Sequence, residues 1–158
     1  GVAEVGLKWP NDVGWRGRKL GGILLESGGK AGAFFVVAGV GLNIALPKSE
    51  ATAIDQPWVD LVEILGADRV SRNHLAALLI SNLIEIFVRF QQGGFADLAT
   101  EWARFDQVAG QQVRLNLPHT AVIGIARGVD ASGALLLETA DGRITPYIGG
   151  EISLRIKP

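Results

Sequence analysis

The sequence predicts an α+β protein, with a mixed sheet and packed helices in its first two thirds and a small all-β unit in its last third. Two observations lead to this prediction. Short apolar runs bounded by glycines fill residues 5–43 and recur in residues 112–156, whereas residues 71–105 carry apolar side chains at helical spacing. The chain has 158 residues, of which 48% are hydrophobic, so it can bury one sizeable core with a small satellite domain.

The first block is expected to form strands of a buried sheet. Apolar runs occupy residues 5–7, 21–25 and 34–38, and each run is too short for a helix. The polar, glycine-rich residues 26–32 connect the last two runs and predict a hairpin. Residues 46–57 are small and polar, with a proline near either end, and predict a loop whose order depends on a bound molecule.

Trp58 opens a short helical pattern, and the clearest helix of the sequence follows it. That helix is expected to begin near Ser71 or Asn73, where a capping side chain is available, and to end at Gly93 and Gly94. Polar and charged side chains interrupt its apolar run, so it is not expected to span a membrane. Its apolar stripe predicts a helix of the core. The stripe consists of Leu75, Leu78, Leu79, Asn82, Ile86, Phe87 and Phe90.

A second amphipathic segment, residues 95–105, is expected to pack on the same layer. Beyond Asp106 the pattern changes to short strand candidates separated by turn signals, which is typical of a small β-barrel or sandwich. We therefore predict two domains, residues 1–105 and residues 106–158. The five strand candidates are residues 112–117, 121–129, 134–138, 143–147 and 152–156.

Composition and charge exclude several classes of function. The formal net charge is −1 and the charged residues are interspersed, which removes the electrostatic basis for a nucleic-acid or membrane-surface patch. The chain has no cysteine, so it can form neither disulfides nor thiolate metal sites. Its two histidines are too scattered for metal-ligand spacing. We expect a cytoplasmic protein with no metal held directly by its side chains.

Three clusters contain residues suited to chemistry, and the first is the pentad Lys8-Trp9-Pro10-Asn11-Asp12. Proline holds an extended turn here between an aromatic ring, an amide and a carboxylate. The pentad also has a purely structural interpretation, because Asn-Asp after proline is common in turns and tryptophan is common in cores. Both interpretations stay open on the pentad alone.

The second cluster is a basic turn that leads into a glycine-rich strand, Leu20-Gly21-Gly22-Ile23-Leu24. Glycines at this point let a ligand approach the backbone closely. Lys19 sits where the turn becomes an apolar strand, so we expect its ammonium to lie at the mouth of a pocket. Arg16 and Arg18 are expected to face water.

The third cluster is Gly39-Val40-Gly41-Leu42-Asn43. It lacks the third glycine and the following helix of a dinucleotide fingerprint, so a Rossmann site is rejected. A tight strand end whose backbone N–H groups meet a ligand remains as the interpretation.

Taken in this order, the motifs resemble the bacterial biotin protein ligase family. The resemblance rests on residues 8–12, 18–24, 39–43 and the terminal Gly149-Gly150-Glu151-Ile152-Ser153-Leu154-Arg155. It spans nearly the whole chain. It implies the C-terminal part of a catalytic domain of the class II synthetase type in residues 1–105 and a small SH3-like barrel in residues 106–158.

The resemblance also implies a two-step reaction. Biotin and ATP form biotinyl-5′-AMP, and a lysine of the biotin carrier domain of acetyl-CoA carboxylase then accepts the biotin. Lys19 matches the family's cation between the biotin carboxylate and the phosphate. Asp12 matches an aspartate that orients or deprotonates the incoming lysine, or helps to hold Mg²⁺ through its phosphates.

Further roles are implied for the other matching positions. Lys8 and Asn11 would support the adenylate phosphate, and the biotin pocket would be lined by Gly22, Gly39 and Gly41. Asn43 would face the adenine, and Trp58 with residues 46–57 would cover the nucleotide. Arg155 would contribute to ATP binding.

Parts of the family pattern do not occur in this sequence. The glycine- and arginine-rich biotin loop would lie upstream of Lys8, so we expect this chain alone not to ligate biotin. DNA binding would require a helix-turn-helix further upstream, and a homodimer is implied by the family alone. Two alternatives stay open: a non-catalytic ligase-like module that binds a carrier domain or itself through sheet edges, and a relative of the lipoate ligases.

Overall fold

The computed structural model describes residues 4–30, 32–47, 56–149 and 153–156. The chain divides into two compact units, and each is described by itself. The first unit comprises Gly1–Gly6 and Asn11–Leu75, and the second comprises Leu7–Pro10 and Ala76–Pro158. This grouping differs from the predicted boundary between residues 105 and 106, because the second unit already begins at Ala76 and also includes a short piece of the N-terminal pentad. The predicted domain boundary stays a prediction.

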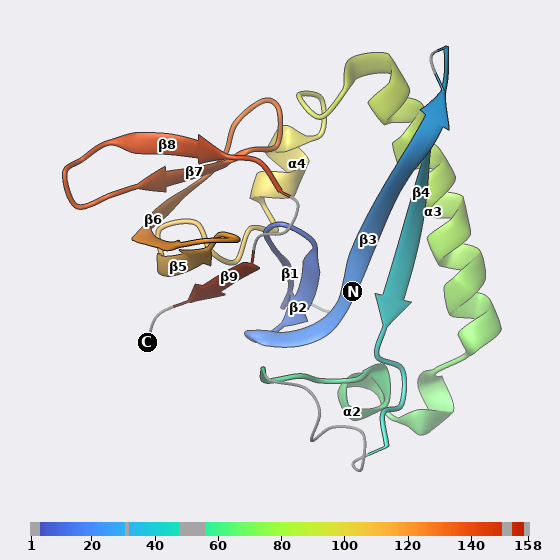
Figure 1. The fold of residues 1–158 in the computed structure, drawn as a ribbon. Helices are drawn as coiled ribbons and strands as arrows, with labels where there is room; N and C mark the ends of the chain where they lie inside the picture. The colour runs from blue at the N-terminus through green and yellow to red at the C-terminus, as the bar shows by residue number, and fades with distance from the viewer. Residues whose placement is uncertain (1–3, 31, 48–55, 150–152, 157–158) are drawn as a thin grey trace. The chain divides into compact units, whose positions relative to one another are not determined.

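The first unit is built on a four-stranded sheet with the order β1-β2-β3-β4. Its strands are β1 (Val5–Lys8), β2 (Asp12–Trp15), β3 (Arg18–Lys30) and β4 (Ala33–Leu42). β3 and β4 form a long antiparallel hairpin, drawn in blue and teal in Figure 1. The α+β fold class predicted from the sequence is confirmed.

The β3–β4 hairpin is longer than predicted. The connection was expected over residues 26–32, but Glu26 pairs with Val37 and Lys30 pairs with Ala33, so residues 26–30 belong to the ladder. The reason is the partner strand, because β-branched and aromatic residues on β4 favour pairing even opposite glycines. Glycine also tolerates the φ of +136° that Gly29 adopts near the end of β3.

Strand β2 was not predicted, because its residues lie between the pentad and the basic turn, where no separate strand pattern can be recognised. A two-residue turn joins it to β3, with Trp15 opposite Arg18 in the register. Arg16 and Gly17 have φ values of 49° and 73°, as a tight hairpin turn with two left-handed residues requires. This turn, together with a register shift between Val13 and Gly14, brings Asp12 opposite Gly22.

Short helices follow the sheet in the first unit. α2 (Leu61–Leu65) begins after Asp60, whose side chain accepts a hydrogen bond from the Glu63 N–H as an N-cap. η1 is Ala67–Arg69. The helical pattern therefore begins later than Trp58, which instead forms a parallel β-bridge with Lys19.

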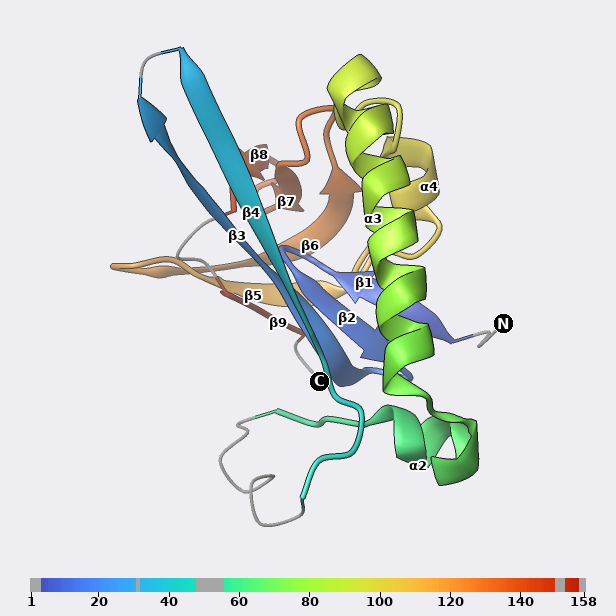
Figure 2. The same cartoon turned by 90° about the vertical axis from the view of Figure 1, so that its right-hand side faces the viewer.

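The long helix is correctly placed by the sequence, but its predicted burial is wrong. α3 (Arg72–Gly93) begins and ends where expected and forms one continuous helix (Figure 2). None of its residues is buried, and Leu78, Phe87 and Phe90 are each about half exposed. An apolar stripe shows which face can be buried, but the depth of burial depends on what packs over it, and here Leu75, Leu79 and Ile86 are only half-buried.

By length and hydropathy alone, α3 is also long and apolar enough to cross a membrane. Core helices of soluble proteins pass the same test. The expectation that this segment does not span a membrane stays a prediction.

The second unit contains α4 (Ala99–Ala103) and a five-stranded sheet with the order β8-β7-β6-β5-β9. Its strands lie within one residue of the predicted candidates: β5 (Gln112–Asn116), β6 (Ala121–Val129), β7 (Leu135–Glu138), β8 (Ile144–Tyr147) and β9 (Ser153–Ile156). All four strand pairings are antiparallel. The SH3-like character of this small unit stays a prediction.

The best-formed core of the described residues lies in the second unit. Trp9 joins this core, with 4% of its surface exposed, and its indole Nε1 donates a hydrogen bond to the Gly133 carbonyl at 3.1 Å. The structural interpretation of this tryptophan is therefore confirmed. The core cluster consists of Trp9, Val108, Val113, Leu115, Ala126, Leu135, Leu137 and Leu154.

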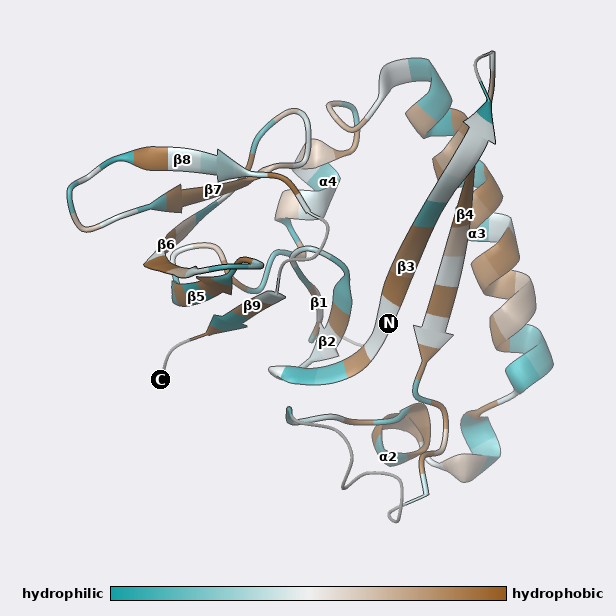
Figure 3. Ribbon diagram, viewed as in Figure 1, coloured by the Kyte–Doolittle hydropathy of each residue, from teal (hydrophilic) through white to brown (hydrophobic). Residues whose placement is uncertain are grey.

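The β3–β4 hairpin, in contrast, exposes large apolar side chains on both faces. Phe34 is 80% exposed and Val36 is 61% exposed, while Phe35 and Val37 on the opposite face are also more than half exposed. Figure 3 shows brown, hydrophobic segments along both strands of the hairpin. Contiguous exposed apolar surface of this kind is uncommon on a monomeric soluble protein.

Candidate functional site

An open hollow of about 570 Å³ lies on the sheet of the first unit, near the start of β3 and the end of β4. Seven of the ten residues predicted for the site line it: Asn11, Asp12, Lys19, Gly22, Gly39, Gly41 and Asn43. The other lining residues are Gly21, Ile23, Leu24, Val40 and Leu42, which the sequence did not single out as site residues. Alternation along a strand could have found Leu24, since it lies on the same face as Gly22.

Glycines form the floor of this hollow. Gly22 pairs with Gly41 across the hairpin, and Leu24 pairs with Gly39, so the three glycines lie on one face of the sheet. A Cβ atom at Gly39 or Gly41 would meet nothing closer than a backbone oxygen at 3.8 or 3.9 Å. Crowding inside the protein is therefore not the reason that these positions are occupied by glycine. Their effect is to leave bare backbone where a ligand can lie flat.

An ion pair stands at one end of the glycine floor. The Nζ of Lys19 lies 2.6 Å from Oδ1 of Asp12, and the two side chains are 33% and 12% exposed. A Cβ at Gly22 would lie 3.6 Å from both Asp12 Oδ1 and Lys19 Cε, so the pair shares the face of that glycine. Partial burial strengthens such a pair relative to one in bulk water. The arrangement places a fixed cation beside a concave surface.

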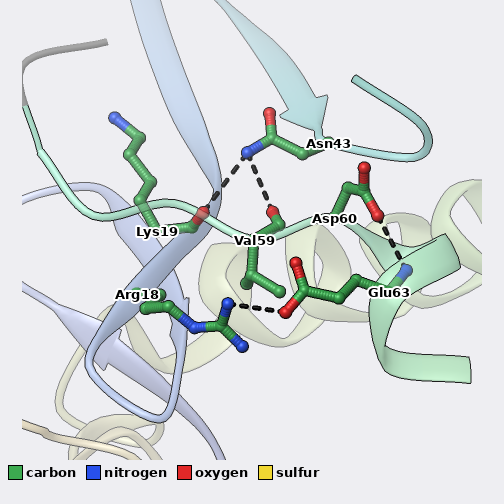
Figure 4. A network of polar contacts seen from close by, with 6 residues as sticks. All are labelled: Arg18, Lys19, Asn43, Val59, Asp60 and Glu63. Carbon is green, nitrogen blue, oxygen red and sulfur yellow. Dashed lines mark hydrogen bonds and ion pairs between the residues drawn. The ribbon is translucent and has the colours of Figure 1, made fainter. Parts of the chain in front are cut away.

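The backbone of Lys19 is held by the chain segment that returns after the loop. Its N–H donates to the Pro57 carbonyl at 2.8 Å, and its carbonyl accepts from the Val59 N–H at 2.9 Å. The side-chain amide of Asn43 donates to the carbonyls of both Lys19 and Val59, at 3.2 and 3.1 Å (Figure 4). The position of Lys19 is therefore fixed by residues that are distant in sequence.

Asn11 connects the pentad to the floor of the hollow. Its Nδ2 donates to the Ile23 carbonyl at 2.8 Å, and its own carbonyl accepts from the Ile23 N–H at 2.9 Å. This pair of bonds docks the turn after Pro10 on β3. Asn11 thereby orients Asp12, the next residue, toward Lys19.

Asp60 was not predicted from the sequence as a site residue, although its carboxylate binds backbone groups of the segments next to the hollow. Only 9% of Asp60 is exposed, and its two carboxylate oxygens accept from the Leu46 N–H at 3.0 Å and the Glu63 N–H at 2.8 Å. Glu63 in turn pairs with Arg18 at 2.6 Å. An acidic N-cap followed three residues later by glutamate is a recognisable helix-start pattern, and that signal could have found Asp60.

The remaining basic residues of the turn pack on an aromatic ring. The guanidinium carbons of Arg16 and Arg18 lie 4.5 and 5.2 Å from the centre of the Trp15 ring. Arg16 also pairs with Glu4 at 2.6 Å. Arg16 is exposed as expected, with 59% of its side chain accessible, whereas only 32% of the Arg18 side chain is exposed, so Arg18 faces water less than expected.

Three predicted site residues lie elsewhere among the described residues. Trp58 does not line the hollow but adjoins it through its bridge with Lys19. Lys8 and Arg155 belong to the second unit. Arg155 stands opposite Arg114 in the β5–β9 ladder and donates to the Leu154 carbonyl at 3.2 Å. The predicted loop at residues 46–57 falls largely outside the described residues.

No metal centre is formed within the described ranges, where no group of three or more His, Cys, Asp or Glu side chains is suitably gathered. Among the described residues that line the hollow, Asp12 is the only one with a carboxylate, and Lys19 pairs with it. The site is therefore suited to binding an anionic, partly apolar ligand through one cation, backbone groups and an apolar wall.

Comparison with known proteins identifies the family. Residues 2–43 match the Biotin/lipoate A/B protein ligase family, and residues 108–155 match the Biotin protein ligase C terminal domain. The chain is similar to the "Bifunctional ligase/repressor BirA" of Escherichia coli, with 42% identity over 98% of this chain and 48% of that protein. It is 36% identical to the "Biotin--[acetyl-CoA-carboxylase] ligase" of Mycobacterium tuberculosis, over 97% of this chain and 54% of that protein.

Solved structures agree with this family. The biotin protein ligase of Aquifex aeolicus superposes with a TM-score of 0.80 at 26% identity, covering 97% of this chain and 65% of that chain. A structure of the same enzyme in complex with biotin and ATP superposes with a TM-score of 0.79, covering 97% of this chain and 62% of that chain. The chain spans about half the length of the curated relatives it matches. From its matching segments, its relatives and its fold, the chain belongs to the biotin protein ligase family.

Proposed function

We propose that the hollow on the first unit binds biotin and its adenylate, and that the chain is part of an enzyme that forms biotinyl-5′-AMP from biotin and ATP and transfers biotin to a protein lysine. One observation carries the proposal: the Lys19–Asp12 pair stands at the end of a bare glycine floor. The structures of the Aquifex aeolicus ligase with biotin, alone or together with ATP, support the choice of ligands. The proposed compartment is the cytoplasm.

In the first step, a biotin carboxylate oxygen attacks the α-phosphorus of ATP. A new P–O bond forms and pyrophosphate leaves. Negative charge builds up on the phosphoryl oxygens, and the ammonium of Lys19 stabilises it without having to reorganise, because its backbone is already fixed. The apolar side chain of Leu24 and the floor of Gly22, Gly39 and Gly41 accommodate the uncharged part of biotin.

In the second step, a lysine amine attacks the acyl carbon of the mixed anhydride, an amide bond forms and AMP leaves. The amine must lose a proton, and we assign to Asp12, a carboxylate that lines the hollow, the role of orienting the amine or accepting its proton. We propose the biotin carrier domain of acetyl-CoA carboxylase as the source of that lysine, since a relative is named for this acceptor. We also propose, from the family resemblance alone, that the protein forms a homodimer.

The other predicted residues have supporting roles in this proposal. Asn43 and Trp58 serve the nucleotide side, whereas the roles implied for Lys8 and Arg155 by the family resemblance stay predictions. Mg²⁺ would be held by the phosphates of ATP, because the described residues offer no cage of carboxylates for it. DNA binding is not part of the proposal.

We also propose that this chain by itself does not complete the ligation. The hollow is open and one third of the Lys19 side chain is exposed, whereas adenylate chemistry requires a site from which water is excluded. Incubation with ATP, biotin and a carrier domain, followed by detection of biotinylated carrier, tests this point. Time-dependent biotinylation by the chain alone would contradict it.

The test of the main proposal is a calorimetric titration with a non-hydrolysable biotinyl-AMP analogue. The chain is expected to bind the analogue, and Lys19→Ala to weaken binding at least about tenfold, because a charge-assisted contact in a partly buried site is lost. Lys30→Ala is the matched control, since it removes an exposed lysine at the far end of β3. Equal binding by Lys19→Ala and the original chain would reject the assignment of the hollow.

The same titration separates the competing functions. A lipoyl-AMP analogue that binds more tightly than the biotin analogue would favour the lipoate branch of the matching family. If neither analogue binds while a carrier domain still does, the chain acts as a non-catalytic module. The exposed β3–β4 hairpin is the observation that keeps this second candidate under test.

A further inference from the structure

The β2–β3 ladder is pinned at both ends. At one end, a tight turn at residues 16–17 with two left-handed conformations joins the strands. At the other end, Asn11 bonds to Ile23 through both its side chain and its backbone carbonyl, at 2.8 and 2.9 Å. Between these pins β2 contributes residues 12–15 and β3 contributes residues 18–22, so five residues face four. The extra residue of β3 must be accommodated as a bulge.

Leu20 is the extra residue. Val13 lies opposite Gly21, and the next pair is Gly14 with Lys19, so Leu20 is left between two consecutive pairs. Only 5% of Leu20 is exposed, which shows that the extra residue is packed inside the unit. A bulge bends its strand and redirects the side chains beside it.

The backbone of β3 shows the same irregularity. The Lys19 carbonyl accepts from the Val59 N–H at 2.9 Å, and the Leu20 carbonyl accepts from the Asn43 N–H at 2.8 Å. The two donors belong to neighbouring segments, since the Leu61 N–H donates to the Asn43 carbonyl at 2.9 Å. Consecutive carbonyls of β3 therefore bond on the same side, whereas in a regular strand they point to alternate sides.

The bulge decides which face of the sheet carries Lys19. In an uninterrupted strand, residues 19 and 22 would lie on opposite faces, because side chains alternate with a period of two. The extra residue cancels one step of that alternation. Lys19 therefore shares the face of Gly22, with its Cε 3.6 Å from where a Cβ of that glycine would stand and its Nζ paired with Asp12. Figure 4 shows the adjacent Arg18 side chain extending away from the Lys19 ammonium, toward Glu63.

We propose that the bulge at Leu20 places the Lys19 ammonium on the face of the glycine floor, which makes Leu20 a positioning residue for Lys19. The inference rests on the proposed function in one respect, because it takes Lys19 as the cation of the site. Gly21 supports the bend in β3, since a Cβ there would collide with the Gly41 carbonyl oxygen and the Leu42 side chain. The position of the cation therefore depends on the number of residues in β3 as well as on their identity.

A zero-length crosslink tests the proposal without any biotin ligand. A carbodiimide activates the Asp12 carboxylate, the Lys19 amine loses a proton and attacks it, an amide bond forms and the activating group leaves as a urea. Groups held in contact react far faster than separated ones, so the Lys19–Asp12 amide reports that both side chains share a face. The original chain is expected to form this amide, detected by mass spectrometry after proteolysis.

Insertion of one glycine between Val13 and Gly14 should remove the bulge. Both ends of the ladder stay pinned, so Leu20 gains the inserted residue as its partner on β2. Uninterrupted alternation then turns Lys19 to the opposite face from Asp12. The yield of their amide is expected to fall at least about tenfold, because the proximity of the two groups is lost.

A glycine inserted between residues 16 and 17 is the matched control. It lengthens the chain equally but only extends the turn, so the yield of the amide should equal that of the original chain. An unchanged yield in the first variant, or an equal fall in both variants, would overturn the proposal, because the crosslink would then not depend on the register of β2 and β3.

A second variant keeps the chain length and covers the case in which the first insertion variant does not fold, as judged by circular dichroism. Arg18→Lys combined with Lys19→Gln moves the amine by one residue, to the position where the Arg18 guanidinium lies 2.6 Å from Glu63. We expect an amide with Glu63 in place of the amide with Asp12. An amide with Asp12 at the yield of the original chain would overturn the proposal. No step uses a biotinyl-AMP analogue, so failure of this inference and failure of the proposed function are distinguishable.

Discussion

The ammonium of Lys19 and the carboxylate of Asp12 meet at 2.6 Å, although Lys19 is the second residue of β3 and Asp12 is the first of β2. Their register explains the contact, because Asp12 lies opposite Gly22, and both Asp12 Oδ1 and Lys19 Cε lie 3.6 Å from where a Cβ of Gly22 would stand. The two residues are expected to act as a unit and not as independent contributors.

A double-mutant cycle on this pair should therefore be non-additive. Asp12→Ala, Lys19→Ala and the double variant are expected to show a coupling free energy of about 0.5–1 kcal/mol in urea unfolding, as partly exposed pairs do. The same cycle with Arg16 and Glu4, which are both more exposed, should give a smaller value. Additivity within error for Lys19 and Asp12 would show that their contact contributes no stability.

Two glycines should respond differently to alanine. Gly41→Ala is expected to fold normally, since its Cβ meets nothing within 3.9 Å, and to weaken binding of a biotinyl-AMP analogue by filling the floor of the hollow. Gly124→Ala should instead destabilise the second unit by about 1–3 kcal/mol, because its Cβ would lie 2.5 Å from the Glu138 carbonyl oxygen. Thermal unfolding and calorimetry separate the two effects, and a destabilised Gly41→Ala with normal binding would contradict the description of the floor.

Asp106 should make stability depend on pH in a defined direction. Burial raises its pKa above 3.8, more than the hydrogen bonds from the Val108 and Ala109 N–H groups lower it, and its Oδ2 is buried without a hydrogen-bond partner. The folded chain then holds this proton at pH values where the unfolded chain has lost it. The contribution of Asp106 to the free energy of unfolding therefore falls as pH rises from about 4 through the raised pKa.

Asp106→Asn should remove that dependence. The variant is expected to gain stability relative to the original chain at pH 7 and to lose this advantage as the pH approaches 4, because asparagine stays neutral throughout. Urea unfolding at several pH values measures the difference. A constant difference across this range would show that Asp106 has the same pKa in both states.

Exposed apolar residues on the hairpin should contribute surface hydrophobicity but little stability. Phe34→Gln is expected to change the free energy of unfolding by less than about 0.5 kcal/mol, since the phenylalanine is 80% exposed. It should reduce the fluorescence of a bound hydrophobic dye. Leu135→Ala, at a fully buried position, should cost about 2–5 kcal/mol and serves as the contrasting control. A large loss of stability in Phe34→Gln would mean that another surface covers Phe34 in solution.

The sequence by itself determined the type and order of most elements. Strand candidates in residues 112–156 agree with β5 to β9 because alternation and turn residues act over a few neighbours. The ends of α3 followed from a capping serine and a pair of glycines. Lys19 could be selected because a cation at the junction of a turn and an apolar strand is a local feature.

Only the tertiary structure decided which residues meet. Strand β2, the long β3–β4 ladder, the Asp60 and Asn43 bonds and the contact of Trp9 with Gly133 all join positions that are separated along the chain. The burial of α3 was mispredicted for the same reason, since periodicity shows a face without showing what covers it. Local sequence patterns determine the backbone conformation that each segment prefers. Strand pairing and burial depend instead on the free energy of contacts between segments that are distant in sequence, and no single segment determines that free energy.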